Sequence, residues 1–105
     1  GEVKDRDVLL MDDMISTGGS ITNAAKVVKK FGARKVYLCA THPVLCGTAM
    51  EKIEAADVER VIVTDSIPLG DKKSEKIMVL SIAPLLADVI INVHHSKSIS
   101  RLFDF

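Results

Sequence analysis

Four short apolar segments limit what this chain can fold into more than any other feature. They lie at residues 8–11, 36–40, 61–63 and 77–80. Together they are rich in β-branched residues, and polar residues do not alternate with the apolar ones. Uninterrupted segments of this kind are typical of strands that are covered on both faces, as in parallel sheets. The segments therefore predict four buried strands.

Helical patterns lie between these segments. Apolar residues recur at helical spacing from Ile21 to Phe31, and Gly32 is placed to end that helix. Thr48 and Glu51 have the spacing of a capping box at the start of a second helix. Strands that alternate with helices predict an α/β fold with a mostly parallel sheet flanked by helices.

A third helix is expected after the last strand. Ser81 is a candidate cap, and Pro84 falls in the first turn, where its missing N–H costs little. The helix has a wide apolar stripe made of Ile82, Leu85, Leu86, Val89, Ile90 and Val93.

The composition narrows the possible partners. Lys and Arg total 14 and Asp and Glu total 14, and a net charge of zero argues against a nucleic acid or a membrane surface. No apolar run has membrane-spanning length, and no signal-peptide pattern occurs. Cys39 and Cys46 match neither a disulfide framework nor a metal-binding CxxC motif. We therefore expect a reducing, cytoplasmic setting, with Cys39 as a small core residue.

The extent of the chain suggests a piece of something larger. A length of 105 residues fits one small domain or part of a bigger one. The chain begins with Gly1 rather than an initiator Met, and a short charged segment leads directly into what looks like an interior strand. We expect residues 1–105 to be a partial domain.

The sequence LLMDDMISTGGSIT, at residues 9–22, carries the chemistry. Asp12 and Asp13 directly follow the first apolar segment, at the carboxyl end of a strand, where ligands gather in parallel α/β sheets. The Gly, Ser and Thr residues behind them lead into the first helix. The N–H groups of such a loop can converge with the helix N-terminus to bind a phosphate dianion. No Lys follows, so this is not the P-loop of nucleoside-triphosphate-binding proteins.

Two acids beside an anion site fit a sugar phosphate. The loop takes the phosphate, while the carboxylates accept hydrogen bonds from vicinal ribose hydroxyls or help to hold a Mg²⁺ ion. The alternative is an ordinary strand–turn–helix corner with solvated acids and a capping Ser, because small-residue turns are common. Composition alone leaves both interpretations open.

The segment LLMDDMISTGGS resembles the phosphoribosyl diphosphate loop that type I phosphoribosyltransferases share with the ribose-phosphate diphosphokinase family. Four further segments are similar to the diphosphokinases in the same order: ATHPVLCGTAMEKI, VIVTDSIPL, KIMVLSIAPLLADVI and SKSISRLF. The resemblance runs from Val3 to Phe103 and matches the carboxyl-terminal part of that enzyme. It implies a type I phosphoribosyltransferase-like fold, with residues 1–105 as a carboxyl-terminal fragment.

The resemblance also implies a reaction and a site. Ribose-phosphate diphosphokinases transfer a diphosphoryl group from Mg·ATP to the anomeric hydroxyl of ribose 5-phosphate. By similarity, Asp12 holds a ribose hydroxyl and Asp13 assists beside it. The residues implied to hold the 5-phosphate are Ser16, Thr17, Gly18, Gly19 and Ser20. Many relatives carry an Asp, often proposed as a base, where this chain has Ser16; the replacement puts a base role in doubt and leaves the backbone donors in place.

Other parts of the family's site are expected outside this chain. The resemblance assigns the adenine pocket, a metal-binding His and a mobile loop with catalytic Lys and Arg to the preceding part of the enzyme. We therefore assign no catalytic and no metal-binding residue to residues 1–105, and expect binding of ribose 5-phosphate without turnover. For the full-length enzyme, the resemblance implies Mg²⁺ as cofactor, ATP as second substrate and a homo-oligomer.

Two rival functions remain. A nucleobase phosphoribosyltransferase has nearly the same loop, but the downstream segments favour the diphosphokinase. The second rival is a non-catalytic subunit, similar to the diphosphokinase, that only binds and regulates; the preceding part of the enzyme decides that question, so this alternative stays open.

Several weaker candidates lie outside the loop. His42 follows the second strand and either faces the cleft or is a hydrogen-bonded structural residue. His94 and His95 close the last helix, where cations suit the helix dipole, a role that is favoured over metal binding. Thr64 and Asp65 end the third strand, as part of a site or of a turn.

The carboxyl-terminal segment has two interpretations. Ser98, Ser100 and Phe103 match a segment that contributes to a regulatory phosphate or ADP site in some relatives. A simple docking segment is the favoured role here.

Overall fold

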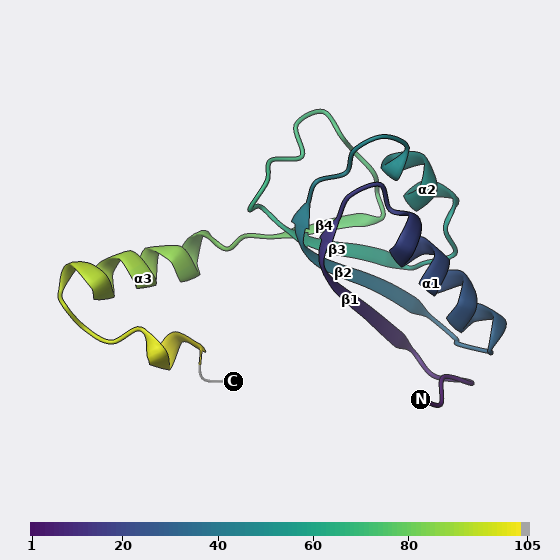
Figure 1. Ribbon diagram of the computed structural model, residues 1–105, viewed down its shortest axis with the longest axis horizontal. Coiled ribbons are helices and arrows are strands. Elements are labelled where there is room, and N and C mark those ends of the chain that lie inside the picture. Colours follow the sequence, from purple (N-terminus) through teal and green to yellow (C-terminus); the bar gives the residue numbers. More distant parts are fainter. Residues whose placement is uncertain (104–105) are drawn as a thin grey trace.

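Four parallel strands form the centre of the computed structural model, which describes residues 1–103. They are β1 (Val8–Ile15), β2 (Val36–Pro43), β3 (Arg60–Thr64) and β4 (Ile77–Leu80), and they lie side by side in chain order. Figure 1 shows the sheet with all strands pointing the same way. The expected strands and the α/β fold with a parallel sheet are confirmed.

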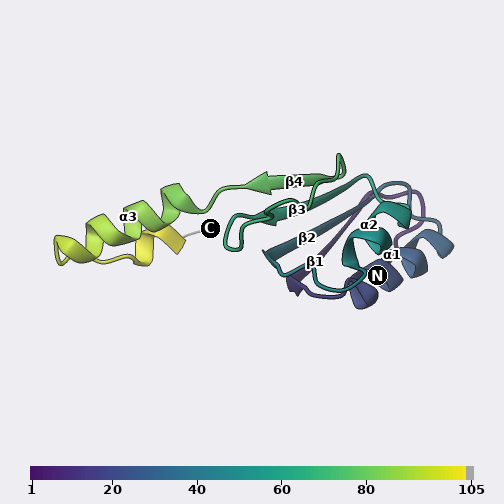
Figure 2. The same cartoon turned by 90° about the horizontal axis from the view of Figure 1, so that it is seen from above.

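Helices α1 (Gly19–Lys30) and α2 (Ala49–Ala55) pack against the same face of this sheet (Figure 2). The core lies between the two layers, where Val36, Leu38 and Val61 from the strands meet Ile21 and Ile53 from the helices. Complete burial of one such aliphatic side chain stabilises a fold by about 1.5–3 kcal/mol. The sheet therefore has one well-covered face.

The first helix ends where the sequence predicts. Gly32 has a left-handed φ of 96°, and its N–H donates to the Lys29 carbonyl at 3.0 Å. The N–H of Ala33 reaches the Val28 carbonyl, also at 3.0 Å. This pair of bonds is the Schellman motif, which needs a residue that tolerates positive φ.

The second helix forms as expected, but the predicted capping box does not. Thr48 is the N-cap of α2, yet its side chain makes no capping hydrogen bond, because its backbone has φ −94° and ψ 21° instead of the extended conformation that capping requires. The helix is held at its other end. Lys76, from the charged loop before β4, donates to the carbonyls of Ile53, Glu54 and Ala56 at 3.2, 2.9 and 2.7 Å.

Helix α3 (Ala83–His94) and the short 3-10 helix η1 (Ser100–Phe103) project away from the sheet (Figure 1). The expected helix is confirmed with Pro84 in its first turn; Ile82 is the N-cap, while Ser81 Oγ accepts the N–H of Ala83 at 3.1 Å. The radius of gyration is 16.3 Å, whereas a compact chain of this length has about 13 Å. No helix within residues 1–103 is long and apolar enough to cross a membrane.

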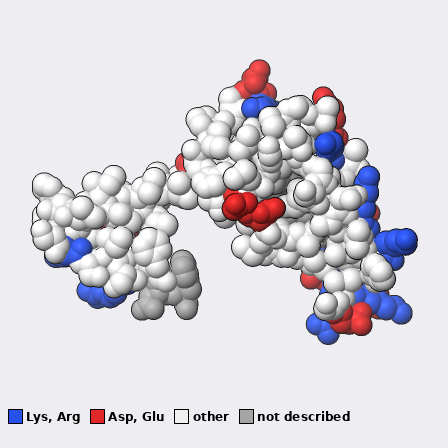
Figure 3. All heavy atoms as spheres, in the orientation of Figure 1, with Lys and Arg blue, Asp and Glu red and all other residues white. Residues whose placement is uncertain are grey.

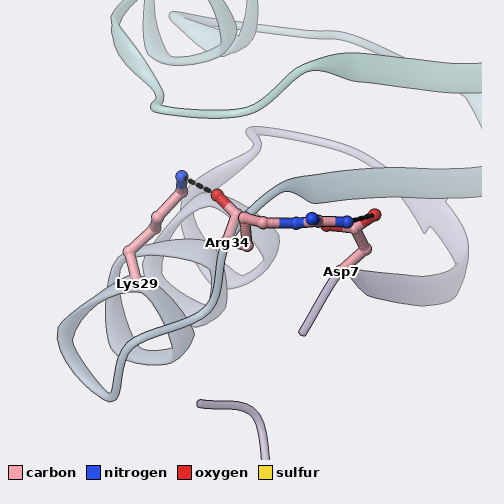
Figure 4. Close-up of polar contacts among 3 residues, drawn as sticks. All are labelled: Asp7, Lys29 and Arg34. Carbon is pink, nitrogen blue, oxygen red and sulfur yellow. Dashed lines mark hydrogen bonds and ion pairs between the residues drawn. The ribbon is translucent and has the colours of Figure 1, made fainter. Parts of the chain in front are cut away.

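An ion pair joins the chain before β1 to the chain before β2 (Figure 4). Arg34 donates from Nε and Nη2 to the two carboxylate oxygens of Asp7, each at 2.9 Å, and Lys29 Nζ donates to the Arg34 carbonyl at 2.7 Å. The hydrogen bond from Arg34 lowers the pKa of Asp7 below its usual 3.8. The pair ties together the amino ends of the two strands.

We predict that Asp7→Asn lowers the melting temperature slightly at neutral pH, because an exposed ion pair contributes little. A lowered folded-state pKa means that this contribution is complete above the unfolded pKa of 3.8 and is lost as the pH falls through the folded value. The difference between variant and wild type should therefore vanish in acid. Thermal melts monitored by circular dichroism across this range test the prediction, with Asp71→Asn as control. A difference that persists in strong acid would contradict it.

Candidate functional site

A cavity of about 200 Å³ lies where β1 meets α1. It is lined by the unbroken stretch of residues 12–21. Every residue of the predicted site therefore lies around one space, namely Asp12, Asp13, Ser16, Thr17, Gly18, Gly19 and Ser20. The site is built from one local segment because a strand, a tight turn and a helix follow each other without insertion.

The acid pair lies inside β1 rather than in the loop after it. The strand continues to Ile15, because Met14 and Ile15 still pair with His42 and Pro43 of β2. Both acids are exposed and lie in the carboxyl-terminal half of the strand. The predicted position at the carboxyl end of a strand is therefore right in outline, but the strand ends later than the sequence suggested.

Each carboxylate of the pair is oriented by the backbone. Asp12 Oδ1 accepts the N–H of Asp13 and Asp13 Oδ1 accepts the N–H of Met14, both at 2.8 Å. Hydrogen bonding with the Asp12 side chain, and then with the Met14 amide, lowers the pKa of Asp13 below its usual 3.8. Asp13 is therefore ionised at neutral pH and acts only as an acceptor.

His42 stands near these acids. Its charge contributes to the lowered pKa of Asp13. Its Nδ1 is 2.8 Å from Ser66 Oγ, so the ring is also held by a structural hydrogen bond. Both roles considered for this residue are thus compatible with its surroundings.

The turn into α1 depends on Gly18. This residue is the N-cap of the helix, is buried and has a φ of 83°. A side chain would be strained there, and its Cβ would lie 3.6 Å from Ala49 Cα on α2. The first turn has no side-chain cap and no acidic residue. The N–H groups of residues 19–21 therefore have no acceptor within the helix and are available to a ligand.

The sequence analysis missed Thr22, which supports this turn from the next turn of α1. Thr22 is 7% exposed, and its hydroxyl donates to the Gly18 carbonyl at 2.6 Å. The N–H of Thr22 donates to the same carbonyl at 3.1 Å. A Thr four residues after the N-cap is the local signal that would have predicted this bond. These two bonds support the turn from within the helix itself.

The loop after β2 braces the other side of the turn. The N–H groups of Leu45 and Cys46 donate to the carbonyls of Ile15 and Ser16 at 2.9 and 3.0 Å. Ser16 Oγ lies 3.3 Å from Cys46 Sγ. These contacts join segments 30 residues apart in the chain, so no local pattern predicts them.

Lys52 is a second residue that the sequence did not reveal. It lies on α2, and its Nζ is 3.7 Å from the position that a Cβ on Gly19 would occupy. It adds positive charge beside the first turn of α1, which is already the positive end of a helix dipole. The surroundings of the turn therefore favour an anion.

Two of the remaining candidates, Thr64 and Asp65, make hydrogen bonds that hold neighbouring segments of the fold in place. Asp65 accepts hydrogen bonds from Ser81 Oγ at 2.6 Å and from the Ile82 N–H at 2.9 Å, which lower its pKa. Thr64 Oγ1 donates to the Thr41 carbonyl at 2.7 Å. Of the two roles left open for Thr64 and Asp65, these bonds favour the turn.

The other candidates lie on the projecting part of the chain. His94 ends α3 and His95 is its C-cap, with their rings 5.2 Å apart and edge to face. Ser98 Oγ and Ser100 Oγ are 2.9 Å apart at the start of η1. These contacts leave the role of the carboxyl-terminal segment as a prediction.

We predict that Thr22→Val destabilises the fold by about 0.5–1.5 kcal/mol, the net value of one hydrogen bond. The same variant should weaken binding of inorganic phosphate, because the turn that orients the α1 amides loses its support. Urea unfolding and calorimetric titration with phosphate measure the two effects. Thr22→Ser keeps the hydroxyl and is the control. Equal phosphate affinity in all three proteins would contradict a supporting role for Thr22.

Comparisons with known proteins agree with this fold. The family model described as phosphoribosyl synthetase-associated domain matches residues 1–104. A ribose-phosphate pyrophosphokinase of Oceanobacillus iheyensis is 48% identical over 105 residues, which are 99% of this chain and 33% of the relative. One of Rhodopirellula baltica is 46% identical over 104 residues, or 98% and 33%.

A solved structure gives the same picture. The phosphoribosylpyrophosphate synthetase from Mycobacterium smegmatis superposes with a TM-score of 0.89 at 41% identity, over 92% of this chain and 33% of that protein. The chain thus spans about a third of the length of these relatives. The matches give the covered share and not its place, so the expected carboxyl-terminal position stays a prediction.

Proposed function

Since this chain belongs to the family of the phosphoribosyl synthetase-associated domain, we propose that it forms the part of a ribose-phosphate diphosphokinase that binds ribose 5-phosphate. The observation that carries the proposal is that residues 12–21 line one shared cavity, with carboxylates along one part and helix amides along another. The whole enzyme would transfer a diphosphoryl group from ATP to the anomeric hydroxyl of the sugar. Relatives that this chain matches are named for that activity.

The first turn of α1 is suited to the 5-phosphate. The N–H groups of residues 19–21 offer hydrogen bonds, and the helix dipole attracts a dianion. The hydroxyls of Thr17 and Ser20 line the same cavity and add donors. Lys52 supplies a full positive charge close by. Gly18 and Gly19 let the phosphate approach the backbone without a side chain in the way.

The acid pair is suited to the ribose hydroxyls. Asp13 is ionised at neutral pH, as its lowered pKa requires, and a carboxylate accepts hydrogen bonds from vicinal hydroxyls. The acids lie on β1 and the phosphate donors begin after the turn, so the two kinds of group contact different parts of one substrate. This division resolves the apparent conflict of two acids beside an anion site.

Mg²⁺ fits this site only if the protein and the substrate coordinate the ion together. Residues 1–103 contain no group of three or more His, Cys, Asp or Glu side chains that could hold a metal by themselves. Mg²⁺ is commonly coordinated by one or two carboxylates together with substrate oxygens and water. Asp12 and Asp13 could supply these carboxylates. When bound, the ion would neutralise charge on the phosphoryl oxygens.

The alternatives are weaker on these observations. The names of the relatives favour a diphosphokinase over a nucleobase phosphoribosyltransferase. A non-catalytic subunit with the same acid pair and loop could bind the same sugar phosphate, so only the activity of a full-length protein separates that possibility.

We predict that Thr17→Ala, tested in the full-length protein, weakens binding of both ribose 5-phosphate and inorganic phosphate. One hydrogen bond to a charged group contributes about 1–3 kcal/mol, and both ligands lose it. Isothermal titration with each ligand gives the comparison. If neither affinity changes, Thr17 does not contact the phosphate.

Asp12→Asn should have the opposite pattern. We expect weaker discrimination between ribose 5-phosphate and its 2-deoxy analogue, with nearly unchanged affinity for inorganic phosphate, because the acid contacts hydroxyls and not phosphate. The same titrations provide the test, with Asp71→Asn in the exposed loop as a matched control. Equal weakening of all ligands by Asp12→Asn would refute this division of the site.

The 105-residue chain itself should not catalyse the reaction. Diphosphoryl transfer needs cationic and metal stabilisation of developing charge, and the resemblance assigns the catalytic Lys, Arg and metal-binding His to other parts of the enzyme. Incubation with Mg·ATP and ribose 5-phosphate should yield no phosphoribosyl diphosphate above background, while a full-length relative serves as positive control. Turnover by the chain alone would show that the catalytic groups lie within it.

A further inference from the structure

Four lysine side chains line a groove beside α1, on the side of that helix that faces α2. Lys26 and Lys52 line its first part, a cavity of about 150 Å³. Lys26, Lys29 and Lys30 line its second part, a cavity of about 360 Å³. Thr22 and Lys26 line both parts, so the two cavities adjoin. We call this space the lysine groove.

The lysine groove begins at the turn that leads into α1. Thr22 directly follows Ile21, the last residue that lines the cavity of the predicted site. Lys52 lies at the junction, because it lines the groove and its Nζ is 3.7 Å from the position of a Cβ on Gly19. Residues 19, 22 and 26 lie on one face of α1, since 3.6 residues make one helical turn. An anion held by the first turn of α1 would therefore have the lysine groove directly beside it.

The positive charge of the groove is only partly balanced. Lys29 Nζ lies 3.6 Å from a carboxylate oxygen of Asp57. Within residues 1–103, Lys26, Lys30 and Lys52 have no carboxylate at ion-pair distance. Figure 3 shows basic side chains along the edge of the molecule that α1 forms, apart from the carboxylates near the carboxyl end of β1. A groove lined by charges of one sign attracts ligands of the other sign.

The shape of the groove suits several anionic groups in a row. Lys26 and Lys30 are four residues apart on α1, or about 6 Å along the helix axis, so cations follow one another along the groove. Glu51 and Glu54 of α2 line neither part of it. Among the described residues, no aromatic side chain lines it, so nothing there would stack on a nucleobase. These features fit a linear chain of phosphoryl groups.

From these observations, we propose that the lysine groove extends the phosphate site, and that the two together bind a linear inorganic oligophosphate. The terminal phosphoryl group occupies the first turn of α1, and the following groups contact Lys52 and then Lys26. The oligophosphate therefore competes with a single phosphate for the same turn. The inference rests on the proposed function only for the position of the phosphate, because it needs an anion at the turn and no sugar at the acid pair.

Calorimetric titration of the chain with inorganic phosphate and with tripolyphosphate, without added metal ions, provides the first test. Tripolyphosphate should bind about tenfold more tightly, the effect of one further hydrogen bond to a charged group. Its affinity should also fall more steeply as salt is added. Lys26→Gln should weaken tripolyphosphate about tenfold and inorganic phosphate much less, while Lys73→Gln, in the loop before β4, is the matched control and should change neither. Circular dichroism should show that both variants are folded.

Three results of these titrations would overturn the proposal. They are equal affinity for the two anions, no binding of either anion, and a preference for tripolyphosphate that survives Lys26→Gln. Displacement provides a fourth comparison, because bound tripolyphosphate should release inorganic phosphate from the turn. Simultaneous binding of both anions would show that they do not share it.

Two further ligands separate this inference from its neighbours. ATP carries the same phosphoryl chain on a nucleoside, and tighter binding of ATP than of tripolyphosphate would overturn the assignment to a free oligophosphate. Ribose 5-phosphate tests the proposed function. If it fails to bind while tripolyphosphate keeps the preference that depends on Lys26, the proposed function is wrong and the oligophosphate site is supported.

Discussion

The parallel pairing of β1 with β2 is the constraint on which the rest of this structure depends. Pairing continues to Ile15 and Pro43, so it holds the acid pair in an extended backbone and fixes the point where the chain must turn. The loop after β2 then lies beside that turn, and the N–H groups of Leu45 and Cys46 bond to Ile15 and Ser16. The site is thus a consequence of strand register as much as of its own sequence.

The turn at Gly18 separates two electrostatic environments. Before it, the strand presents carboxylates that accept hydrogen bonds; after it, the helix presents amides that donate them. Lys52 strengthens the positive side from α2, and the hydroxyl of Thr22 keeps the turn in place. Such an arrangement suits a ligand with an anionic end and a hydroxylated end, which is the chemistry of a sugar phosphate.

The helices cover only one face of the sheet, and α3 projects beyond it, which explains the extended shape of the chain. The helices α1 and α2 lie on one face, while Asp65 directs α3 beyond the end of the sheet. The apolar residues of α3 and of the opposite face of the sheet therefore stay exposed. The cavity at the start of α1 is lined by residues 12–21, none of which belongs to α3.

Features that depend on neighbours in the chain followed from the sequence alone. The four strands, the end of α1 at Gly32 and the grouping of the predicted site residues are set by apolar periodicity, backbone preference and turn chemistry, which act over a few residues. The capping box at Thr48 failed because the local backbone did not take the conformation that capping needs. The later end of β1 was missed because it depends on pairing with another strand.

Tertiary structure decided what distant segments do to one another. Lys52 beside Gly19, Lys76 at the end of α2 and Asp65 at the start of α3 all come from other parts of the chain, so no local spacing reveals them. The sequence determined that Cys39 is an apolar strand position and that α3 has an apolar stripe. Which face of the sheet the helices cover, and hence that both surfaces stay exposed, was decided only by folding, because a period of two or of 3.6 residues identifies a face without identifying its partner.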